Sequence, residues 1–477
     1  MLVSCAPQEE DEYPGPVFHF VPQGSMAGNP VGIFSRNDSV SLFYPADSNN
    51  ELIWKSASSK DKLQWRSLSG FIPGCEEIPM NNPKRILSGA FVMDSFNRSG
   101  LCRTPCLLFL QASWPCESDP LETFKPYLMT ADRGNTWVKT NGVVSIDRDL
   151  GRVKDPKIFF HKSTQKWIML ATTDQKVHFF ESSDLLKWRH VSMFGPAGNT
   201  DLQWENPDLI EVPLEHNPDS VGWVLSVTSG HPSKPGFAAV QYFIGQFDGK
   251  SFFNDAAPEK INLLDHGRDF ISAIRMQIDD QSNGPKESLI AGKIGNNLYG
   301  DDLPDKRLHG MLSLTRKLLI GTSGENTTLI QKPEADLTAA GSVTARNPEE
   351  LSGSVHASIQ FKLKTTGTQK RGIHLLKTAG QQLEIGYDPA TKSVYIDRSA
   401  CGFIGFHPEF SGIDHFELQE VPEELNLQIF LDRNIVEVFI GGGLSVITSL
   451  IFPKDLYGKA EWFGPEQGNS FSAQVIR

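Results

Sequence analysis

Two acidic residues stand beside aromatic and proline neighbours, Asp155 in VKDPKIFF and Glu205 in WENPDLIEV. Glu205 lies between Trp204 and Pro207, so we expect partial burial to raise the pKa of its carboxyl and keep it protonated near neutral pH. A carboxyl group in that state can act as a general acid. The alternative is that both acids are buried carboxylates that accept hydrogen bonds from strand backbone.

Other side chains could share a site with these acids. Lys154 directly precedes the first acid and could stabilise negative charge in a cleft, or it could be a solvated surface charge. His231, Arg275 and Lys293 belong to segments that we expect near the mouth of a cleft, although an ordinary loop or surface role is the more common one for each. Trp54 could line the pocket or belong to the core.

A short motif indicates how these residues are positioned. An Asp opens a turn and an aromatic residue closes it in SKDKLQW (59–65), ADRGNTW (131–137), SSDLLKW (182–188) and FDGKSFF (247–253). The intervals hold several alternating runs each, which is typical of four-stranded blades around an axis. Ordinary hairpin turns are the alternative. We therefore predict an N-terminal tail over 1–16 and a β-propeller over 17–332.

The pattern changes near residue 333. QKPEADLTAAGSVTARNPEELSG is polar and contains prolines, which predicts a linker over 333–350. From 351 to 477 apolar and polar residues alternate, as in SVHASIQFKLKT and LNLQIFLDRNIVEVF, which predicts a β-sandwich. Lectin-like sugar binding by this sandwich is possible, but we favour a structural domain packed on the propeller. The predicted fold class is all-β.

Composition limits the partners. A length of 477 residues exceeds what one hydrophobic core usually organises, which favours two domains. The net charge of -12 argues against nucleic acid or an anionic membrane and favours a small-molecule substrate. No apolar run approaches the roughly 18 residues of a membrane span. The chain start lacks the apolar core of a signal peptide, whereas sequons at Asn37, Asn97 and Asn326 are compatible with secretion, so the location stays open.

The six cysteines form no metal-binding pattern. Cys102, Cys106 and Cys116 lie close together, but a single C-x3-C without a second pair is a weak signal. Buried thiols or one local disulfide are the favoured interpretation. We expect neither a metal nor another cofactor.

In order along the chain, several segments resemble those of glycoside hydrolase family 32, the invertase and inulinase family. FHFVPQGSMAGNPVGIF is similar to the family's opening motif, Trp-Met-Asn-Asp-Pro-Asn-Gly, and ILSGAFVMDSFNRSG, with Ser88, to its Ser-Gly-Ser segment. VKDPKIFF resembles Arg-Asp-Pro, and WENPDLIEV resembles Glu-Cys-Pro-Asp-Leu. The resemblance covers roughly residues 17 to 470 and implies a five-bladed β-propeller followed by a β-sandwich.

The resemblance also implies roles for the acids. In the family, an Asp of the opening motif attacks the anomeric carbon, a Glu protonates the leaving oxygen, and a second Asp holds sugar hydroxyls. Glu205 stands at the acid position and Asp155 at the position of the second Asp. The nucleophile position reads Asn29, whose amide is a poor nucleophile. The nearest other carboxylates, Asp38 and Asp47, fall beyond the motif.

Further departures from the family pattern concern sugar recognition. Ser25 replaces a Trp, Val31 an Asn, Lys154 an Arg and Asn206 a Cys, and Pro45 stands near the family's Gln. An unpaired buried donor costs roughly 1–3 kcal/mol, so several such losses together indicate a different ligand. The candidate catalytic residues are Glu205, Asp155 and Asn29, and the candidate substrate-binding residues are Lys154, Trp54, Ser88, Val31, Asn206, His231, Arg275 and Lys293.

Three functions follow. The first, which the pocket substitutions favour, is a non-hydrolytic enzyme in which Glu205 is a general acid on a less polar small molecule, for example a dehydration followed by cyclisation or cycloaddition. The second is a β-fructofuranosidase acting on sucrose, inulin, levan or an unusual fructoside. The third is a pseudoenzyme that binds carbohydrate without turnover.

Overall fold

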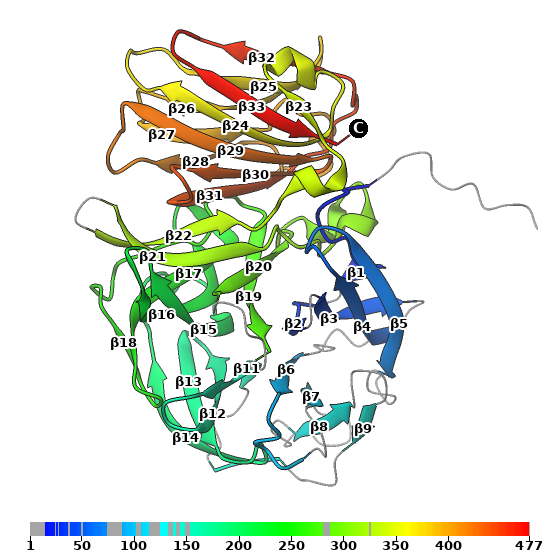
Figure 1. Cartoon of the computed structure of the whole chain (residues 1–477), viewed down its shortest axis with the longest axis vertical. Helices are drawn as coiled ribbons and strands as arrows, with labels where there is room; N and C mark the ends of the chain where they lie inside the picture. Colours follow the sequence, from blue (N-terminus) through cyan, green and yellow to red (C-terminus); the bar gives the residue numbers. More distant parts are fainter. Residues whose placement is uncertain are drawn as a thin grey trace, which may run out of the picture.

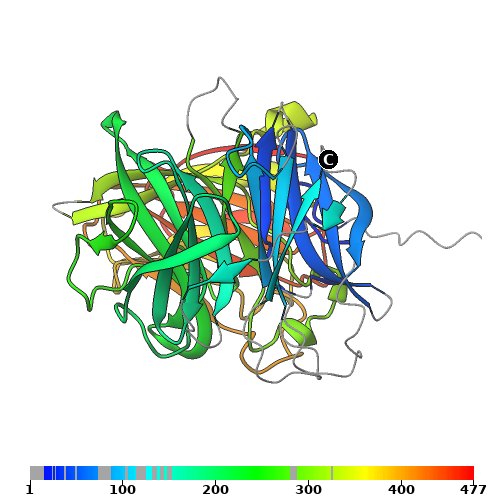
Figure 2. The same ribbon diagram turned by 90° about the horizontal axis from the view of Figure 1, so that it is seen from below.

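The protein consists of a ring of antiparallel sheets and a two-sheet sandwich, which are the blue-to-green and the yellow-to-red parts of Figure 1. This computed structural model describes residues 15–23, 25–26, 28–36, 39–48, 51–73, 88–101, 106–113, 125–131, 137–139, 144–147, 153–279, 287–323 and 326–476. Seen from below, the strands of the ring lie in front of those of the sandwich (Figure 2).

The ring is a propeller of five four-stranded blades. The first two blades are β2 (Gly32–Arg36), β3 (Ser39–Ser48), β4 (Glu51–Ser59), β5 (Trp65–Pro73) and β6 (Ser88–Asp94), β7 (Cys106–Ser113), β8 (Lys125–Ala131), β9 (Trp137–Lys139). The third and fourth are β11 (Lys154–His161), β12 (Lys166–Thr173), β13 (Lys176–Ser182), β14 (Lys187–Phe194) and β15 (Glu205–Leu214), β16 (Asn217–His231), β17 (Lys234–Phe247), β18 (Phe252–Asn254). The fifth is β19 (Phe270–Ile278), β20 (Leu289–Ile294), β21 (Arg316–Ser323), β22 (Asn326–Pro333), and the short β1 (Ser25–Met26) and β10 (Ser145–Ile146) pair with β3 and β14.

The first strand of each blade lies nearest the axis, and the ring closes between the last blade and the first. There β19 pairs in parallel with β2, with Met276 opposite Ile33. All first strands therefore run in the same direction along the axis. Their beginnings meet at one mouth of the propeller, and their ends meet at the other.

The repeated motif forms the turn between the third and fourth strands of a blade. Asp61, Asp184 and Asp248 each accept backbone N–H groups from the residues that follow them. The closing Trp188 donates its indole N–H to the carbonyl of Leu185 at 3.0 Å. In the second blade the motif lies between β8 and β9, and its residues 132–136 are outside the described part of the chain.

The C-terminal part is a β-sandwich. One sheet contains β23 (Val343–Ala345), β33 (Ser470–Val475), β24 (His356–Lys364), β29 (Glu424–Asp432), β30 (Ile435–Ile440) and β31 (Ser445–Leu450). The other contains β28 (Ile413–Glu417), β27 (Ser393–Asp397), β26 (Leu383–Asp388), β25 (Arg371–Lys377) and β32 (Lys459–Phe463). The alternating side chains of the two sheets bury one apolar core, in which Ile359, Ile385 and Ile429 have no exposed surface.

This architecture confirms the predicted fold class, a five-bladed propeller followed by a β-sandwich. The segment predicted as a linker is partly ordered into the second domain, because β23 pairs with β33 of the sandwich. In the described residues the helical elements are short 3-10 turns, η1 (Gly300–Asp302), η2 (Lys306–Leu308), η3 (Leu337–Ala340) and η4 (Pro348–Leu351).

A buried network of charges joins the two domains. His19, near the chain start, contacts Asp432 Oδ2 at 2.8 Å through Nδ1 and Glu437 Oε1 at 2.9 Å through Nε2. Arg316 Nη2 lies 2.6 Å from Glu437 Oε2 and 2.9 Å from Asp265 Oδ2. None of these five side chains has exposed surface. Three of these ion pairs, His19–Asp432, His19–Glu437 and Arg316–Glu437, join a propeller residue to a sandwich residue and hold the two domains together.

Arg316→Met tests this junction. The substitution leaves the Asp265 and Glu437 carboxylates buried beside each other without their cation, and breaking a buried pair in this way costs about 3–5 kcal/mol. We expect a loss of that size in the free energy of unfolding, measured with urea. Lys364→Met is the matched control, because the Lys364–Glu424 pair is exposed and is worth below about 1 kcal/mol. Equal effects of the two variants would contradict the role of the network.

The same network predicts a pH dependence. Burial alone would lower the pKa of His19, but the hydrogen bonds and charges of Asp432 and Glu437 outweigh it and raise the pKa from 6.5 to about 9. A histidine whose pKa is raised by folding stabilises the folded state fully at pH values below its unfolded pKa. This stabilisation is lost as the pH rises through the folded pKa. We therefore expect the His19 contribution to the free energy of unfolding to decline between pH 6.5 and about 9. His19→Gln should remove that decline in urea titrations, and an unchanged pH slope in the variant would refute the assignment.

Candidate active site

The first strands of the third and fourth blades begin with the same local structure. Asp155 in β11 and Asn206 in β15 each precede a proline and have positive φ angles of 52° and 50°. The pairing register of each strand with its neighbour shifts within these first residues, as in a β-bulge. Asp and Asn tolerate this left-handed conformation better than other residues with a side chain. Bulges of this kind re-aim side chains at functional sites.

The two bulges bring four of the predicted site residues together at one mouth of the propeller. The backbone N–H of Asn206 donates to Asp155 Oδ2 at 3.1 Å, which links the third blade to the fourth. Lys154 Nζ lies 3.6 Å from Glu205 Oε1 and 3.3 Å from Gln203 Oε1. The acidic pair and the lysine therefore form one cluster.

The environment of Glu205 suits a proton donor. Its side chain keeps 45% of its surface exposed, so the carboxyl group is accessible from solvent. Burial raises the pKa of this carboxyl, and the negative charge of Asp155 raises it further, while Lys154 opposes both effects. The raised pKa leaves a larger fraction of the Glu205 carboxyl protonated near neutral pH, as its aromatic and proline neighbours predicted.

The segment around Asn29 is held by two buried lysines. Lys293 Nζ donates to the carbonyl of Gly28 at 2.9 Å, and Lys157 Nζ donates to the carbonyl of Pro30 at 3.3 Å. Each lysine residue is 7% exposed. Burial lowers the pKa of Lys157, and it lowers that of Lys293 to about 8. The position that would carry a nucleophile in the family is therefore clamped on both sides.

Sequence reasoning named Lys293 but missed Lys157. The available signal was a lysine inside the strand sequence DPKIFF, whose following residues are apolar and buried. A lysine is almost never fully buried unless it has a partner. The sequence did not reveal its partners. The carbonyl of Pro30 is distant in sequence, and the charges of Asp208 and Asp155 come near Lys157 only because of the two bulges.

Trp54 and Val31 belong to the core of the first two blades. Trp54 has no exposed surface, and Val31 is 5% exposed. The Trp54 ring packs edge-to-face against Phe109 at 4.8 Å and against Phe91 at 6.5 Å between centroids. Trp54 is therefore a core residue rather than a pocket residue. Neither Trp54 nor Val31 presents an apolar surface at the propeller mouth.

His231 and Ser88 lie at the same end of the propeller as Glu205. His231 ends β16, is 5% exposed and contacts Lys234 Nζ at 3.3 Å, next to the sandwich residue Asp414. Burial, followed by the charge of Lys234, lowers the pKa of His231 to about 4, so its ring is neutral at pH 7. His231 therefore lies at the domain junction. Ser88 is the first residue of β6, and its side chain is outside the described part.

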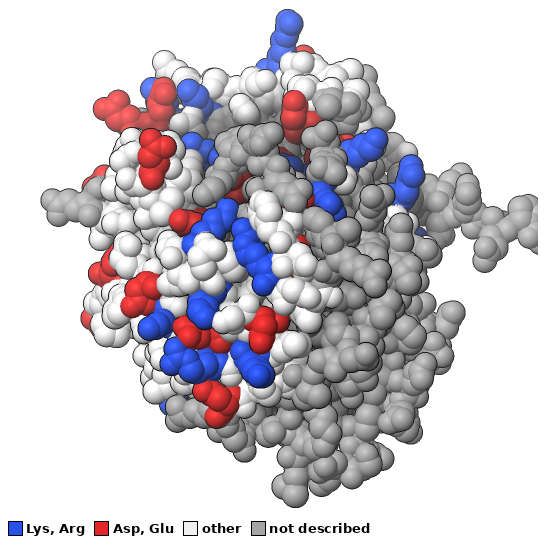
Figure 3. All heavy atoms as spheres, turned by 60° about the horizontal axis from the view of Figure 1, so that its bottom comes forward, with Lys and Arg blue, Asp and Glu red and all other residues white. Residues whose placement is uncertain are grey.

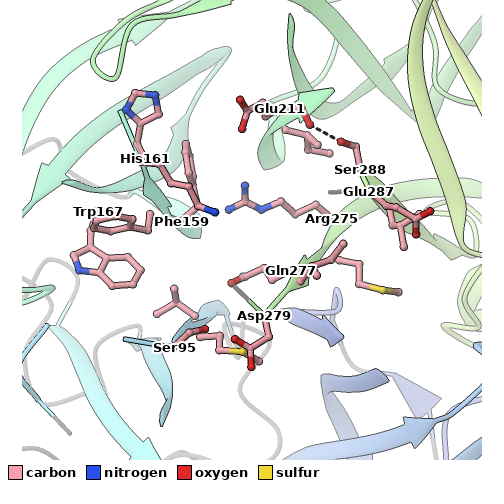
Figure 4. Close-up of a pocket in the computed structure, with 18 of the residues that line it drawn as sticks. Ser95, Phe159, His161, Trp167, Glu211, Arg275, Gln277, Asp279, Glu287 and Ser288 are labelled. Carbon is pink, nitrogen blue, oxygen red and sulfur yellow. Dashed lines mark hydrogen bonds between the residues drawn. The ribbon is translucent and has the colours of Figure 1, made fainter. Parts of the chain in front are cut away.

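Arg275 corrects the expectation that this residue reaches the cleft mouth. It lies in the second half of β19 and crosses the axis, where its Nη1 donates to the carbonyl of Leu209 at 3.0 Å and its Nη2 to that of Ile158 at 3.2 Å. The guanidinium lies 4.5 Å from the centroid of the Phe159 ring. Because β19 begins at the mouth that holds Glu205, a side chain in its second half faces the opposite mouth of the propeller. There it lines a cavity (Figure 4).

Two other properties bear on partners. Among the described residues, no group of three or more His, Cys, Asp or Glu side chains could hold a metal ion. None of the helices in the described part is long and apolar enough to cross a membrane. On the face of the molecule in Figure 3, acidic and basic side chains lie interspersed.

Known proteins match both domains. Residues 19–333 match the N-terminal domain of the glycosyl hydrolases family 32, and residues 319–476 match the C-terminal one. The levanase of Bacillus subtilis (strain 168) is 28% identical over 463 residues, which cover 93% of this chain and 67% of that protein. The extracellular exo-inulinase of Meyerozyma guilliermondii is 27% identical over 474 residues, which cover 92% of this chain and 89% of that protein.

Solved structures share the fold. An exo-inulinase from Aspergillus awamori has a TM-score of 0.83 at 23% identity and covers 96% of this chain and 97% of its own. A β-fructofuranosidase from Schwanniomyces occidentalis, complexed with fructosyl-erythritol, has a TM-score of 0.78 at 22% identity, with coverage of 97% and 98%. The fold is thus that of the propeller-and-sandwich enzymes. With both domains matched, the chain belongs to glycoside hydrolase family 32.

Lys293→Met tests the clamp on the Asn29 segment. The substitution leaves the Gly28 carbonyl without its donor, which costs about 1–3 kcal/mol for a buried group. We expect amide hydrogen exchange in residues 28–36 to accelerate roughly tenfold or more, since about 1.4 kcal/mol corresponds to a factor of ten. Lys317→Met, which removes a surface pair with Glu287, is the control and should leave this exchange unchanged. Unchanged exchange in Lys293→Met would show that the clamp does not hold the segment.

Proposed function

We propose that the protein is a glycosidase that cleaves a β-fructofuranosidic bond, with Glu205 as the proton donor to the leaving oxygen. The observation that carries the proposal is the cluster of Glu205, Asp155 and Lys154 at the propeller mouth, in which the pKa of Glu205 is raised. Levanases and exo-inulinases among the relatives, and fructofuranosidases among the similar structures, support fructosides as substrates.

The absence of a carboxylate at position 29 favours a single displacement by water. In this route Glu205 gives its proton to the glycosidic oxygen, the bond from that oxygen to the anomeric carbon breaks, and a water oxygen bonds to the same carbon. The Asn29 amide orients this water, and the Asp155 carboxylate takes up its proton. The clamp of Lys157 and Lys293 fixes the backbone on both sides of Asn29, which supports such a positioning role.

A second function, acid catalysis on a less polar small molecule, is the one that the sequence substitutions favoured. The specific observation behind it is the amide of Asn29, because dehydration and cyclisation need a proton donor such as Glu205 but no nucleophilic carboxylate. The relatives offer no support for a cyclase or a lyase, and Trp54 and Val31 are core residues here. We therefore place this function after the glycosidase.

Glu205→Gln and Asn29→Asp test the glycosidase proposal. We expect fructose release from sucrose, inulin or levan by the unaltered protein, and a loss of about 100-fold or more in Glu205→Gln, because a general acid contributes roughly 10²–10⁴-fold. The rate should fall as the pH rises through the raised pKa of Glu205. Asn29→Asp should increase the rate by supplying a nucleophile. Glu259→Gln, an exposed residue of the fourth blade, is the control.

The outcomes separate the three hypotheses. No fructose release by the unaltered protein, and none by Asn29→Asp, would contradict the proposal and favour the non-hydrolytic enzyme. Release by Asn29→Asp alone would indicate a glycosidase that has lost its activity. Calorimetric binding of fructose or sucrose without any product would indicate the carbohydrate-binding pseudoenzyme.

A further inference from the structure

A cavity of about 300 Å³ lies at the end of the propeller opposite the candidate active site. Its walls come from the ends of the first strands β6, β11 and β19, from the middle of β15 and from the adjoining parts of β12, β16 and β20. Along β15, Glu211 of this cavity is six residues beyond Glu205, which corresponds to roughly 20 Å at about 3.3 Å per residue. The cavity is therefore separate from the catalytic cluster.

Two polar side chains of β19, Arg275 and Gln277, form part of the cavity wall. Arg275 bridges β19 to the backbone of β15 and β11, as described above, and its Nε lies 3.5 Å from Asp208 Oδ1. Gln277, two residues further along β19, donates from Nε2 to the carbonyl of Phe91 in the second blade at 3.0 Å. These contacts fix the floor of the cavity in place.

The space is far larger than a packing defect. Voids in protein interiors that exceed one water molecule are few, and a water occupies about 30 Å³ of liquid volume. A cavity of about 300 Å³ matches the lower end of the roughly 300–1,000 Å³ of small-molecule sites. Its size suits a single sugar unit or a short polyol.

Most charged groups in the wall are already paired with residues outside the cavity. Asp279 contacts Arg36 at 3.2 Å, and Glu287 contacts Lys317 at 2.9 Å. Ser288 donates its hydroxyl to the backbone carbonyl of Glu211 at 2.5 Å. These two paired carboxylates need no charged ligand, and the Glu211 carboxylate of the same wall disfavours an anion, so a neutral ligand that donates hydrogen bonds fits the wall.

Two groups retain hydrogen-bonding capacity toward the cavity. The Glu211 side chain makes no hydrogen bond or ion pair with any described residue, and in Figure 4 its carboxylate points toward the side where His161 lies. His161 Nδ1 contacts Thr164 Oγ1 at 2.8 Å, which leaves Nε2 without a partner in the described part. Burial lowers the pKa of His161, so the ring is neutral at pH 7 and Nε2 can accept or donate according to the tautomer.

The indole ring of Trp223 neighbours both groups. Trp223 of β16 is the cross-strand neighbour of Glu211, and its ring centroid lies 5.7 Å from that of His161. A carboxylate, a neutral imidazole and an aromatic wall around a small chamber form the usual combination of apolar lining with a few convergent polar groups. Sugar hydroxyls can donate to the carboxylate and pair with the imidazole.

We propose that this cavity is a second binding site, specific for a neutral sugar unit, in which Glu211 and His161 hold the hydroxyl groups and Trp223 forms the wall. The choice of fructose-containing sugars as ligands rests on the proposed function of the opposite mouth. Its place at the opposite end of the propeller makes it a site for a second sugar molecule or for another part of a long chain, independent of the reacting bond.

The test uses the full chain with the catalytic mouth impaired by Glu205→Gln. Calorimetry with fructose and with sucrose, together with crystals soaked in fructose, should show sugar beside Trp223. Adding Glu211→Gln should weaken that binding roughly tenfold, since the neutral amide replaces a charged hydrogen-bond acceptor and retains only part of its interaction. Glu259→Gln in the same background is the control and should leave it unchanged.

Three results would overturn the proposal: sugar at the catalytic mouth alone, sugar at neither mouth, or binding of tetramethylammonium in the cavity where fructose and sucrose do not bind. The test also separates the two proposals. If the protein releases no fructose but Glu211→Gln still weakens a sugar site beside Trp223, the catalytic proposal fails and this one stands. If fructose is released and Glu211→Gln changes no binding, the reverse holds.

Discussion

The shared direction of the first strands is the constraint on which the rest of the structure depends. Because five blades surround one axis and β19 closes the ring in parallel with β2, every first strand begins at one mouth and ends at the other. Residues far apart in sequence, such as those at positions 29, 155 and 205, are thereby directed to one mouth. The same geometry assigns residues near the ends of these strands, with Arg275 and Gln277 among them, to the cavity at the opposite mouth.

Local backbone conformation and buried lysines then position the residues of the candidate active site. Asp155 and Asn206 have a left-handed backbone conformation at the beginnings of two neighbouring blades. The backbone N–H of Asn206 donates a hydrogen bond to the Asp155 carboxylate and so joins the two blades. Lys157 and Lys293 then hold the chain on either side of Asn29. The backbone on both sides of Asn29 therefore has a fixed support. The proposal of an acid-catalysed reaction without a covalent intermediate rests on this combination.

The fold could be predicted from the sequence, because both the recurring turns and the alternating strand patterns were direct signals of it. The Asp-to-aromatic turns recur in four of the five blades, and alternation marks the sandwich strands, so the architecture could be deduced from local pattern. The cluster of Lys154, Asp155, Glu205 and Asn206 followed from short motifs. Arg275 and Lys157 could not be placed in the same way, since their positions depend on the direction of a strand relative to the axis and on partners in other blades. The preference for a non-hydrolytic enzyme gave too much weight to Val31, which is a buried core residue.

The ion pairs of His19 have a consequence for the order in which the molecule assembles. His19 lies 413 residues before its partner Asp432 and 418 before Glu437. During synthesis the N-terminal segment therefore emerges long before the groups that neutralise it, and the first blade cannot pair with β19 until the fifth has been made. Contacts of such long range slow folding, because the intervening chain must be ordered first. The ring and its junction should thus form late and together, leaving the open edge of β2 exposed on the ribosome for chaperones to protect.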